Sequence, residues 1–276
     1  MKYQKISDLC GVYSFLLFLH VMKNHGSHFV TLFLLVFAGL SGTLKAQDKV
    51  VVDAADKVTF EASDHVIVTA LLYKTTDTLP YIILFHDVNS SKGEFRHETK
   101  KFLKLGYNLL AVDLRNGGLC DSVPNETAVL AKLRQPNIGN AEVQLDMVAA
   151  INYVHTISKK KVILLGSGYS ASLVLYIGAT NPLVSAVVAY SPYDYFGGSL
   201  KTADVFPKYQ SIPVYVASSQ AEENDAKKYI AAIPSARVTQ FAPTGSGSHG
   251  SGALLPYDAD FHSYWISLLL FLKSVK

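Results

Sequence analysis

The chain has 276 residues, of which 49% are hydrophobic, 17% are charged and only two are cysteines. This composition excludes a disordered chain and a small domain held together by disulfides. The formal net charge of +3 arises entirely in residues 1–46, which contain four lysines and one aspartate. Residues 47–276 therefore have equal numbers of basic and acidic side chains, and we expect no nucleic-acid partner.

Residues 22–46 have the layout of a secretory signal peptide. Lys23 follows Met22, an apolar run covers residues 29–40, and small and polar residues lead to Ala46. The run is shorter than the ~20 residues that a membrane-spanning anchor needs. We expect translation to start at Met22, cleavage after Ala46, and export to the periplasm or the medium as a single domain of residues 47–276. A retained anchor is the alternative, and an uncleaved leader is the only expected contact with a membrane.

Apolar runs of strand length alternate with helix-like segments from residue 57 onward. The first two runs alternate apolar and polar residues, as antiparallel edge strands do, and later runs are continuously apolar, as central parallel strands are. This order predicts an α/β fold with a mainly parallel eight-stranded sheet and helices on both faces. The expected strands are 57–61, 66–73, 81–85, 108–112, 162–165, 184–189, 214–217 and 237–241; the expected helices are 95–105, 141–157, 169–179, 222–232 and 259–272, with Asn140 and Asp258 as N-caps of the second and last.

The loops at the carboxyl ends of parallel strands are where active sites form in such sheets. Residues 86–93, after the third expected strand, can offer backbone N–H groups to an anion. Residues 166–172 (GSGYSAS) make a sharp turn of small residues between the fifth strand and a helix. Residues 245–252 (GSGSHGSG) place His249 where packing gives no reason for a histidine. Together these features are typical of nucleophilic acyl transfer.

At this level the chain resembles a known family. Residues 57–275 are similar to an α/β-hydrolase of the dienelactone-hydrolase or esterase-like kind, through the segments LFHD, LGYNLLAVDLRNGG, VILLGSGYSAS and GSHGS. The resemblance implies the α/β-hydrolase fold, cleavage of an ester or similar acyl bond of a small substrate, and no cofactor. It also implies that His249 is the general base. The backbone N–H groups of Val88 and of the residue after the nucleophile would stabilise the oxyanion.

The identity of the nucleophile is open. In the pattern G-x-S-x-G the serine stands two residues after the glycine that ends the strand, and that slot falls on Gly168, with Tyr169 after it. A second frame, residues 168–172, offers Ser170, which would then lie in the first turn of the following helix.

The triad acid is also open. The loop after the seventh strand contains Glu222 and Glu223, which could instead serve as first-turn acids of a helix. Asp194 follows the sixth strand and a proline, where an aspartate also forms turns. The remaining histidines show no metal-ligand spacing, so we expect no metal site.

Two hypotheses follow. In the first, the chain is an exported serine hydrolase in which Ser170 attacks, His249 is the base and Asp194 or Glu222 orients it. In the second, it is a catalytically inactive α/β-hydrolase-fold protein that binds a small ligand or a partner. The glycine at position 168 and the lack of a clear aspartate after the seventh expected strand motivate the second hypothesis.

Overall fold

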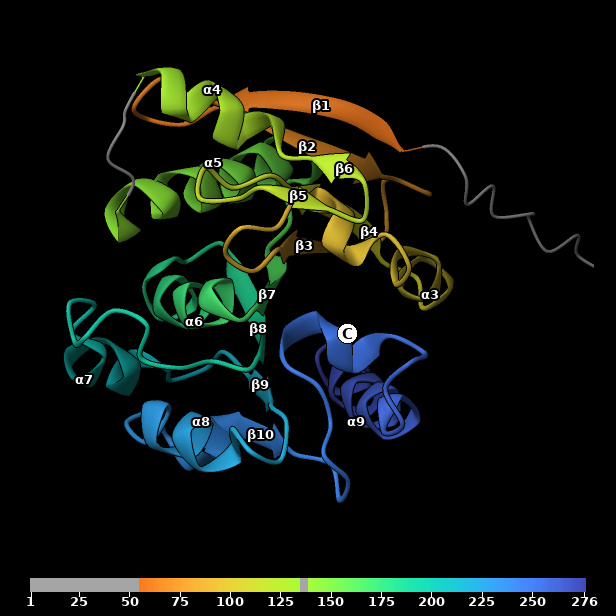
Figure 1. Ribbon diagram of the computed structural model, residues 1–276, viewed down its shortest axis with the longest axis vertical. Helices are drawn as coiled ribbons and strands as arrows, with labels where there is room; N and C mark the ends of the chain where they lie inside the picture. The colour runs from red at the N-terminus through yellow and green to blue at the C-terminus, as the bar shows by residue number, and fades with distance from the viewer. Residues whose placement is uncertain (1–54, 135–138) are drawn as a thin grey trace, which may run out of the picture. The chain divides into compact units, whose positions relative to one another are not determined.

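A central sheet of eight strands organises the computed structural model, which describes residues 55–134 and 139–276 (Figure 1). The strand order within the described residues is β1-β2-β4-β3-β7-β8-β9-β10. β1 and β2 are antiparallel to each other, β2 is antiparallel to β4, and all other neighbours are parallel. The bounds are β1 Asp56–Glu61, β2 Ile67–Tyr73, β3 Tyr81–Phe85, β4 Asn108–Val112, β7 Val162–Ser167, β8 Val184–Tyr190, β9 Val214–Ala217 and β10 Val238–Phe241.

This architecture confirms the predicted fold class, with two antiparallel strand pairs at one edge of the sheet. Each expected strand agrees with an observed one to within two residues. The agreement has a physical basis, since every residue of β3 and β4 is buried whereas β1 alternates exposed and half-buried residues. Strands covered on both faces read as continuous apolar runs, and edge strands do not.

Helices cover both faces of the sheet (Figure 1). On one face, α5 and α6 pack on a core that includes Met147, Leu173 and Val187. On the other face, α9 packs on a core that includes Leu165, Val188 and Leu268. The helix bounds are α3 Thr99–Lys104, α4 Glu126–Arg134, α5 Asn140–Ser158, α6 Tyr169–Thr180, α7 Thr202–Val205, α8 Glu223–Tyr229 and α9 Phe261–Ser274.

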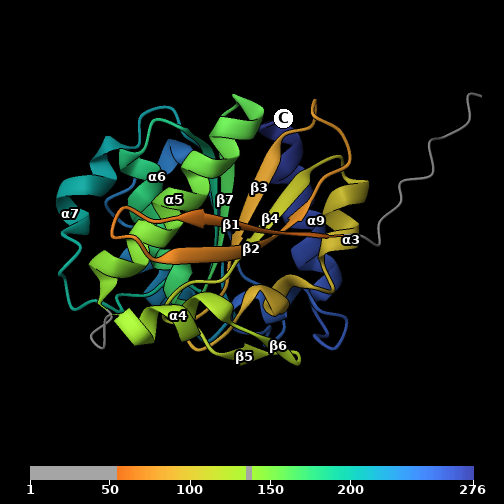
Figure 2. The ribbon, with the colours of Figure 1, turned by 90° about the horizontal axis from the view of Figure 1, so that it is seen from above.

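Several local expectations were wrong. The expected helix 95–105 is divided into a 3-10 turn, η1 (Lys92–Phe95), and the short α3. The helix α4 and the hairpin β5 (Leu119–Cys120) and β6 (Val123–Pro124) were not expected; they lie close together in the second view (Figure 2).

The two expected N-caps were also wrong. Gly139 is the N-cap of α5, and Asp260 is the N-cap of α9. Asp258 instead closes the preceding turn, because its Oδ1 accepts a hydrogen bond from the backbone N–H of Asp260 at 2.6 Å.

A buried ion cluster ties the loop after β4 to its surroundings. The Arg115 side chain is fully buried and donates to both carboxylate oxygens of Asp146 on α5, at 2.6 Å from Nη2 to Oδ1 and 3.0 Å from Nε to Oδ2. Its Nη2 also donates to Oδ1 of Asp64, in the β1–β2 turn, at 3.0 Å. Burial alone would lower the pKa of Arg115, but its bonds to the two carboxylates raise the pKa above its ordinary value.

The predicted leader, residues 1–46, lies outside the described residues. Among the residues that are described, no helix is long and apolar enough to cross a membrane.

Candidate active site

The turn between β7 and α6 has the shape of a nucleophile elbow. Gly168 connects the strand directly to the helix with φ 50° and ψ −115°. Residues with a side chain rarely adopt a positive φ, whereas glycine does so without strain. The strained strand-to-helix turn is where α/β-hydrolases hold their nucleophile. The position that the G-x-S-x-G pattern assigns to the nucleophile therefore lies at the elbow, but its residue, Gly168, has no side chain.

Ser170, the nucleophile of the alternative motif match over residues 168–172, bonds to the main chain and not to the candidate base. It is fully buried in the first turn of α6, and its Oγ donates to the main-chain oxygen of His86. The structure therefore does not bring Ser170 and His249 together.

The carboxylate of Asp87 occupies the space beside the empty slot. Asp87 follows β3, and a Cβ built on Gly168 would lie 2.3 Å from its Cγ, its Oδ1 and its Oδ2. Its Oδ1 accepts hydrogen bonds of 2.7 Å from the backbone N–H of Val88 and of 2.7 Å from the backbone N–H of Tyr169. These are the two N–H groups that the resemblance assigned to an oxyanion, and an anionic oxygen of the protein itself lies between them.

His249 bridges two carboxylates. Its Nε2 is 3.1 Å from Oδ2 of Asp87, and its Nδ1 is 2.5 Å from Oε1 of Glu222. Glu222 is held in turn, because its Oε2 accepts from Ser191 Oγ at 2.7 Å and from the backbone N–H of Ser219 at 3.1 Å. Of the acid candidates, the structure brings Glu222 to the histidine.

Asp194 makes turn contacts instead. Its Oδ1 accepts from the backbone N–H groups of Phe196 and Gly198, both at 3.2 Å. No hydrogen bond or ion pair of Asp194 with His249 occurs in the described part of the chain. This arrangement matches the turn-forming alternative for this aspartate.

His86 supports the Asp87 loop from inside the protein. It is fully buried, its Nε2 accepts from the backbone N–H of Leu114 at 2.9 Å, and its Nδ1 is 2.6 Å from the main-chain oxygen of Asp87. Since one ring nitrogen accepts, the other carries the proton and donates to Asp87.

Opposite charges shift the pKa values of the cluster. Burial alone would raise the pKa of Asp87, but the hydrogen bonds from His249, Tyr169 and Val88 outweigh it and hold that pKa below its ordinary value. Burial alone would also raise the pKa of Glu222, but its hydrogen bonds with His249, Ser191 and Ser219 outweigh burial and lower that pKa to about 2. The two carboxylates, Asp87 first, raise the pKa of His249 to about 10 against the opposing effect of burial. At neutral pH the cluster is thus an imidazolium between two carboxylates.

Glu94 joins the two loops that carry Asp87 and His249. Its Oε2 accepts from the backbone N–H of Asp87 at 2.8 Å, and its Oε1 accepts from Ser251 Oγ at 2.7 Å. The backbone N–H of Ser251 also donates to Ser167 Oγ, at the end of β7, at 2.9 Å. The histidine loop is therefore fastened to both neighbouring strand ends.

The cluster is open to solvent on one side. The exposed fractions of the side chains are 47% for His249 and 25% for Asp87, and 33% for Glu222. Tyr193 and Tyr195 are exposed on the loop after β8. The Tyr195 hydroxyl lies 3.5 Å from the main-chain oxygen of Ser191, the residue whose Oγ donates to Glu222. Burial first, and then the charges of Asp87 and Glu222, raise the pKa of Tyr195 to about 12.

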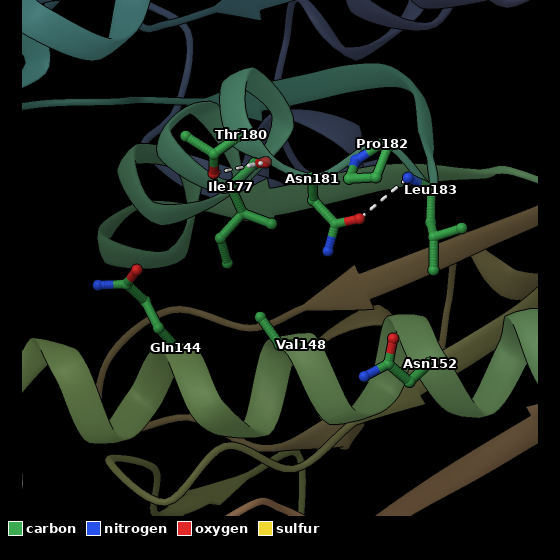
Figure 3. A pocket seen from close by; sticks show the side chains of 8 residues that line it. All are labelled: Gln144, Val148, Asn152, Ile177, Thr180, Asn181, Pro182 and Leu183. Carbon is green, nitrogen blue, oxygen red and sulfur yellow. Dashed lines mark hydrogen bonds between the residues drawn. The ribbon is translucent and has the colours of Figure 1, made fainter.

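A separate groove runs between α5 and α6 (Figure 3). None of its lining residues belongs to the cluster, and the two hydrogen bonds drawn there are local bonds of the turn at the end of α6. The residues lining the groove are Gln144, Val148, Asn152, Ile177, Thr180, Asn181, Pro182 and Leu183.

No group of histidine, cysteine, aspartate and glutamate side chains suited to a metal ion occurs in the described ranges.

Asp87 is the member of the cluster that the sequence analysis did not predict. The segment LFHD indicates backbone N–H donors for an anion, and nothing within it indicates a role for the aspartate side chain. The available signal was the combination of a glycine in the nucleophile slot with an acidic residue in the turn after the neighbouring strand β3, which pairs with β7.

The elbow, the histidine–glutamate pair and the two inward N–H groups on a mainly parallel sheet define an α/β-hydrolase. The sequence model of the dienelactone hydrolase family matches residues 68–233. The chain belongs to that family. No curated protein sequence matches the chain.

Solved structures share the fold at low sequence identity. An esterase from Pyrococcus furiosus is 16% identical with a TM-score of 0.59, and the match covers 80% of this chain and 91% of that one. A cold-adapted esterase from an Arctic intertidal metagenomic library is 12% identical with a TM-score of 0.59, over 80% and 93% of the two chains. A 2,6-dihydroxy-pseudo-oxynicotine hydrolase is 12% identical with a TM-score of 0.57, over 79% and 69%.

Proposed function

We propose that this chain is a small-molecule hydrolase that works at the Asp87–His249–Glu222 cluster and does not form an acyl-enzyme on a serine. The observation that carries the proposal is the retained base and acid, since Nδ1 of His249 lies 2.5 Å from Glu222 and its Nε2 faces the elbow. Family membership supports hydrolysis as the class of reaction. Export, to the periplasm or the medium, is part of the proposal and rests on the leader-like residues 22–46.

Acyl transfer through Ser170, the first hypothesis from the sequence, has no support in the geometry. Its hydroxyl is buried and committed to the main chain of His86. A nucleophile must lie within hydrogen-bond reach of its base, and Ser170 has no such contact with His249.

Restoring a serine at the elbow tests the absence of serine chemistry. Gly168→Ser alone places a Cβ against the Asp87 carboxylate, so the double variant Asp87→Ala/Gly168→Ser is needed to make room. We expect no labelling of the wild-type protein by a fluorophosphonate, and labelling of the double variant at the introduced serine. Asp87→Ala alone is the matched control and stays unlabelled. Labelling of a wild-type serine that depends on His249 would contradict the proposal.

The second hypothesis, an inactive protein that binds a small ligand or a partner, is favoured by the resting charge state of the site. His249 holds a proton at neutral pH, because its pKa is raised to about 10 by the two carboxylates, and Oδ1 of Asp87 fills the N–H pair. Turnover separates the two functions. The proposed hydrolase converts at least one member of a panel of small p-nitrophenyl esters, primary alkyl bromides and epoxides, and His249→Gln abolishes this turnover. A panel without any turnover favours the inactive protein.

A further inference from the structure

Asp87 has the position of a nucleophile without being part of the elbow. Its carboxylate carbon and both oxygens lie 2.3 Å from where a Cβ of residue 168 would be. The Asp87 side chain, from the end of β3, thus fills the space that a side chain at position 168 would occupy. Only one quarter of it is exposed, on the side where the cluster meets solvent.

The two oxygens of this carboxylate have different surroundings. Oδ1 accepts from the N–H groups of Val88 and Tyr169, each at 2.7 Å. Oδ2 has His249 Nε2 at 3.1 Å as its neighbour. If Oδ2 carried an ester bond, Oδ1 would be the ester carbonyl oxygen. That oxygen would already lie between two N–H donors, with the histidine–glutamate pair beside the carbonyl carbon.

We propose that Asp87 is the catalytic nucleophile, and that its Oδ2 attacks a saturated carbon that bears a leaving group, to form an alkyl ester with the protein. This inference rests on the proposed hydrolase function and names its substrate class. Carboxylates serve as nucleophiles in covalent catalysis, and a neighbouring base then completes the reaction.

The occupied N–H pair is the reason for a saturated carbon rather than an acyl carbon. Attack on an acyl group places negative charge on the substrate's carbonyl oxygen, which needs an oxyanion hole in the first step. Here Oδ1 of Asp87 fills that hole. Displacement at a saturated carbon creates no such oxyanion, so the first step proceeds with the hole filled. The hole is needed only in the second step, where it holds the carbonyl oxygen of the Asp87 ester.

In the first step, a lone pair on Oδ2 forms the bond to carbon, and the bond from that carbon to the leaving group breaks. The leaving group departs with the electron pair, as bromide does from an alkyl bromide. Asp87 then has no charge, and His249 keeps only Glu222 as an anionic partner. Loss of one of the two charges that raise its pKa allows His249 to release its proton, either to solvent when bromide leaves or to the alkoxide oxygen of the opened ring when the substrate is an epoxide.

In the second step, neutral His249 takes a proton from water, and the water oxygen bonds to Cγ of Asp87. The negative charge of the tetrahedral intermediate develops on Oδ1, between the N–H groups of Val88 and Tyr169. The bond from Cγ to the alkyl oxygen then breaks, and His249 returns the proton to the alkoxide. The carboxyl group of Asp87 finally gives its proton to His249, which restores the starting state. The net reaction converts an alkyl bromide and water into an alcohol, bromide and a proton.

A single-turnover experiment in ¹⁸O-labelled water tests this assignment. The full chain is used in molar excess over 1-bromobutane or 1,2-epoxybutane. We expect the alcohol or diol of the first turnover to contain unlabelled oxygen from Asp87, and the peptide that contains Asp87 to gain ¹⁸O. Label in the first-turnover product with an unlabelled Asp87 peptide would overturn the nucleophile while leaving the proposed hydrolase function intact.

Trapping of the ester gives a second readout. His249→Gln lacks the base of the second step, so we expect its Asp87 peptide to gain the mass of the butyl group, or of the hydroxybutyl group from the epoxide. His249→Gln/Asp87→Asn gives no adduct there, and His249→Gln/Asp194→Asn, which changes a turn aspartate, traps as His249→Gln does. Peptide mapping separates the adduct from alkylation of the free thiol of Cys120. Absence of an adduct from both probes overturns the inference, and if the wild-type protein also turns over neither these probes nor any ester, the proposed function fails with it.

Discussion

Two clusters in this protein have the same order of charges, a cation between two carboxylates, and opposite surroundings. In Asp64–Arg115–Asp146, the side chains of Arg115 and Asp146 are fully buried. In Asp87–His249–Glu222, the side chain of the central His249 is 47% exposed. The first cluster fastens a loop to the β1–β2 turn and to α5, and the second lies open beyond the carboxyl ends of three strands, β3, β9 and β10.

The cations themselves account for the difference in role. A guanidinium keeps its proton at any pH a protein tolerates, so the Arg115 cluster has a single state. An imidazole changes its protonation when a neighbouring charge changes. The same pattern of charges therefore gives a fixed structural contact in the Arg115 cluster. In the His249 cluster it gives a group that can gain and lose a proton.

Removal of the Asp87 charge has the largest expected effect on activity. Asp87→Asn keeps the side chain's size and lacks the anionic oxygen, so we expect turnover to fall by about a million-fold, as for loss of a covalent nucleophile elsewhere. Steady-state kinetics on the panel substrate that the wild-type protein converts gives the measurement. Asp194→Asn serves as the control with unchanged kcat, and a loss below tenfold for Asp87→Asn would speak against covalent catalysis.

Removal of the buried cation has the largest expected effect on stability. Arg115→Met leaves Asp146 charged and without its partner in the interior, and we expect the free energy of unfolding to fall by about 3 to 5 kcal/mol. Urea denaturation followed by circular dichroism measures this. His249→Gln, in the exposed cluster, is the comparison and should cost far less. Equal losses from the two variants would show that the distinction between the clusters is wrong.

A buried acid outside both clusters, Glu98, sharpens the comparison. The buried carboxyl oxygens of Glu98 have no hydrogen-bond partner among the described residues, and burial raises the pKa of Glu98 to about 8. The folded protein thus binds a proton that the unfolded chain releases above pH 4.5, so this group lowers stability as pH rises from 4.5 to 8. We expect Glu98→Gln to raise the free energy of unfolding above pH 8 by about 1 to 3 kcal/mol. Urea titrations at pH 5 and pH 9 make the test, and equal effects of Glu98→Gln at both values would refute it.

The smallest expected effect is the pH dependence that His249 gives to stability. Its pKa is raised from 6.5 to about 10 in the folded protein. The resulting stabilisation is fully present below pH 6.5 and is lost as pH rises toward 10. Solvent exposure of the side chain reduces its size. Thermal unfolding between pH 6.5 and 10 should show a shallower decline for His249→Gln than for the wild-type protein. Parallel curves would mean that the two carboxylates do not stabilise the imidazolium.

Much of the fold could be predicted from the sequence, because burial on both faces leaves a local signature. YIILF and NLLAV are apolar without interruption, and the structure places both in the centre of the sheet. The helix α4 was missed because it packs only at the edge and keeps Val129, Leu130 and Leu133 exposed, which blurs its periodicity.

The candidate site was harder to predict because it depends on contacts between distant segments. His249 and Glu222 stand in loops where chemistry is expected, so local context was enough to propose them. Asp87 gains its role from Gly168 and Tyr169, more than 80 residues later, through the pairing of β3 with β7. Nothing in the residues around Asp87 shows that its side chain turns back onto its own loop's N–H group.

The Glu94 carboxylate connects two loops of the site. It accepts a hydrogen bond from the backbone N–H of Asp87 and another from Ser251 Oγ. The loops that carry Asp87 and His249 are linked through the Glu94 side chain, so neither loop can swing outward without the other. A substrate would therefore approach a preassembled pair from the side on which Asp87 and His249 are exposed to solvent. Selectivity would then reside in the width and chemistry of that entrance rather than in a closing motion.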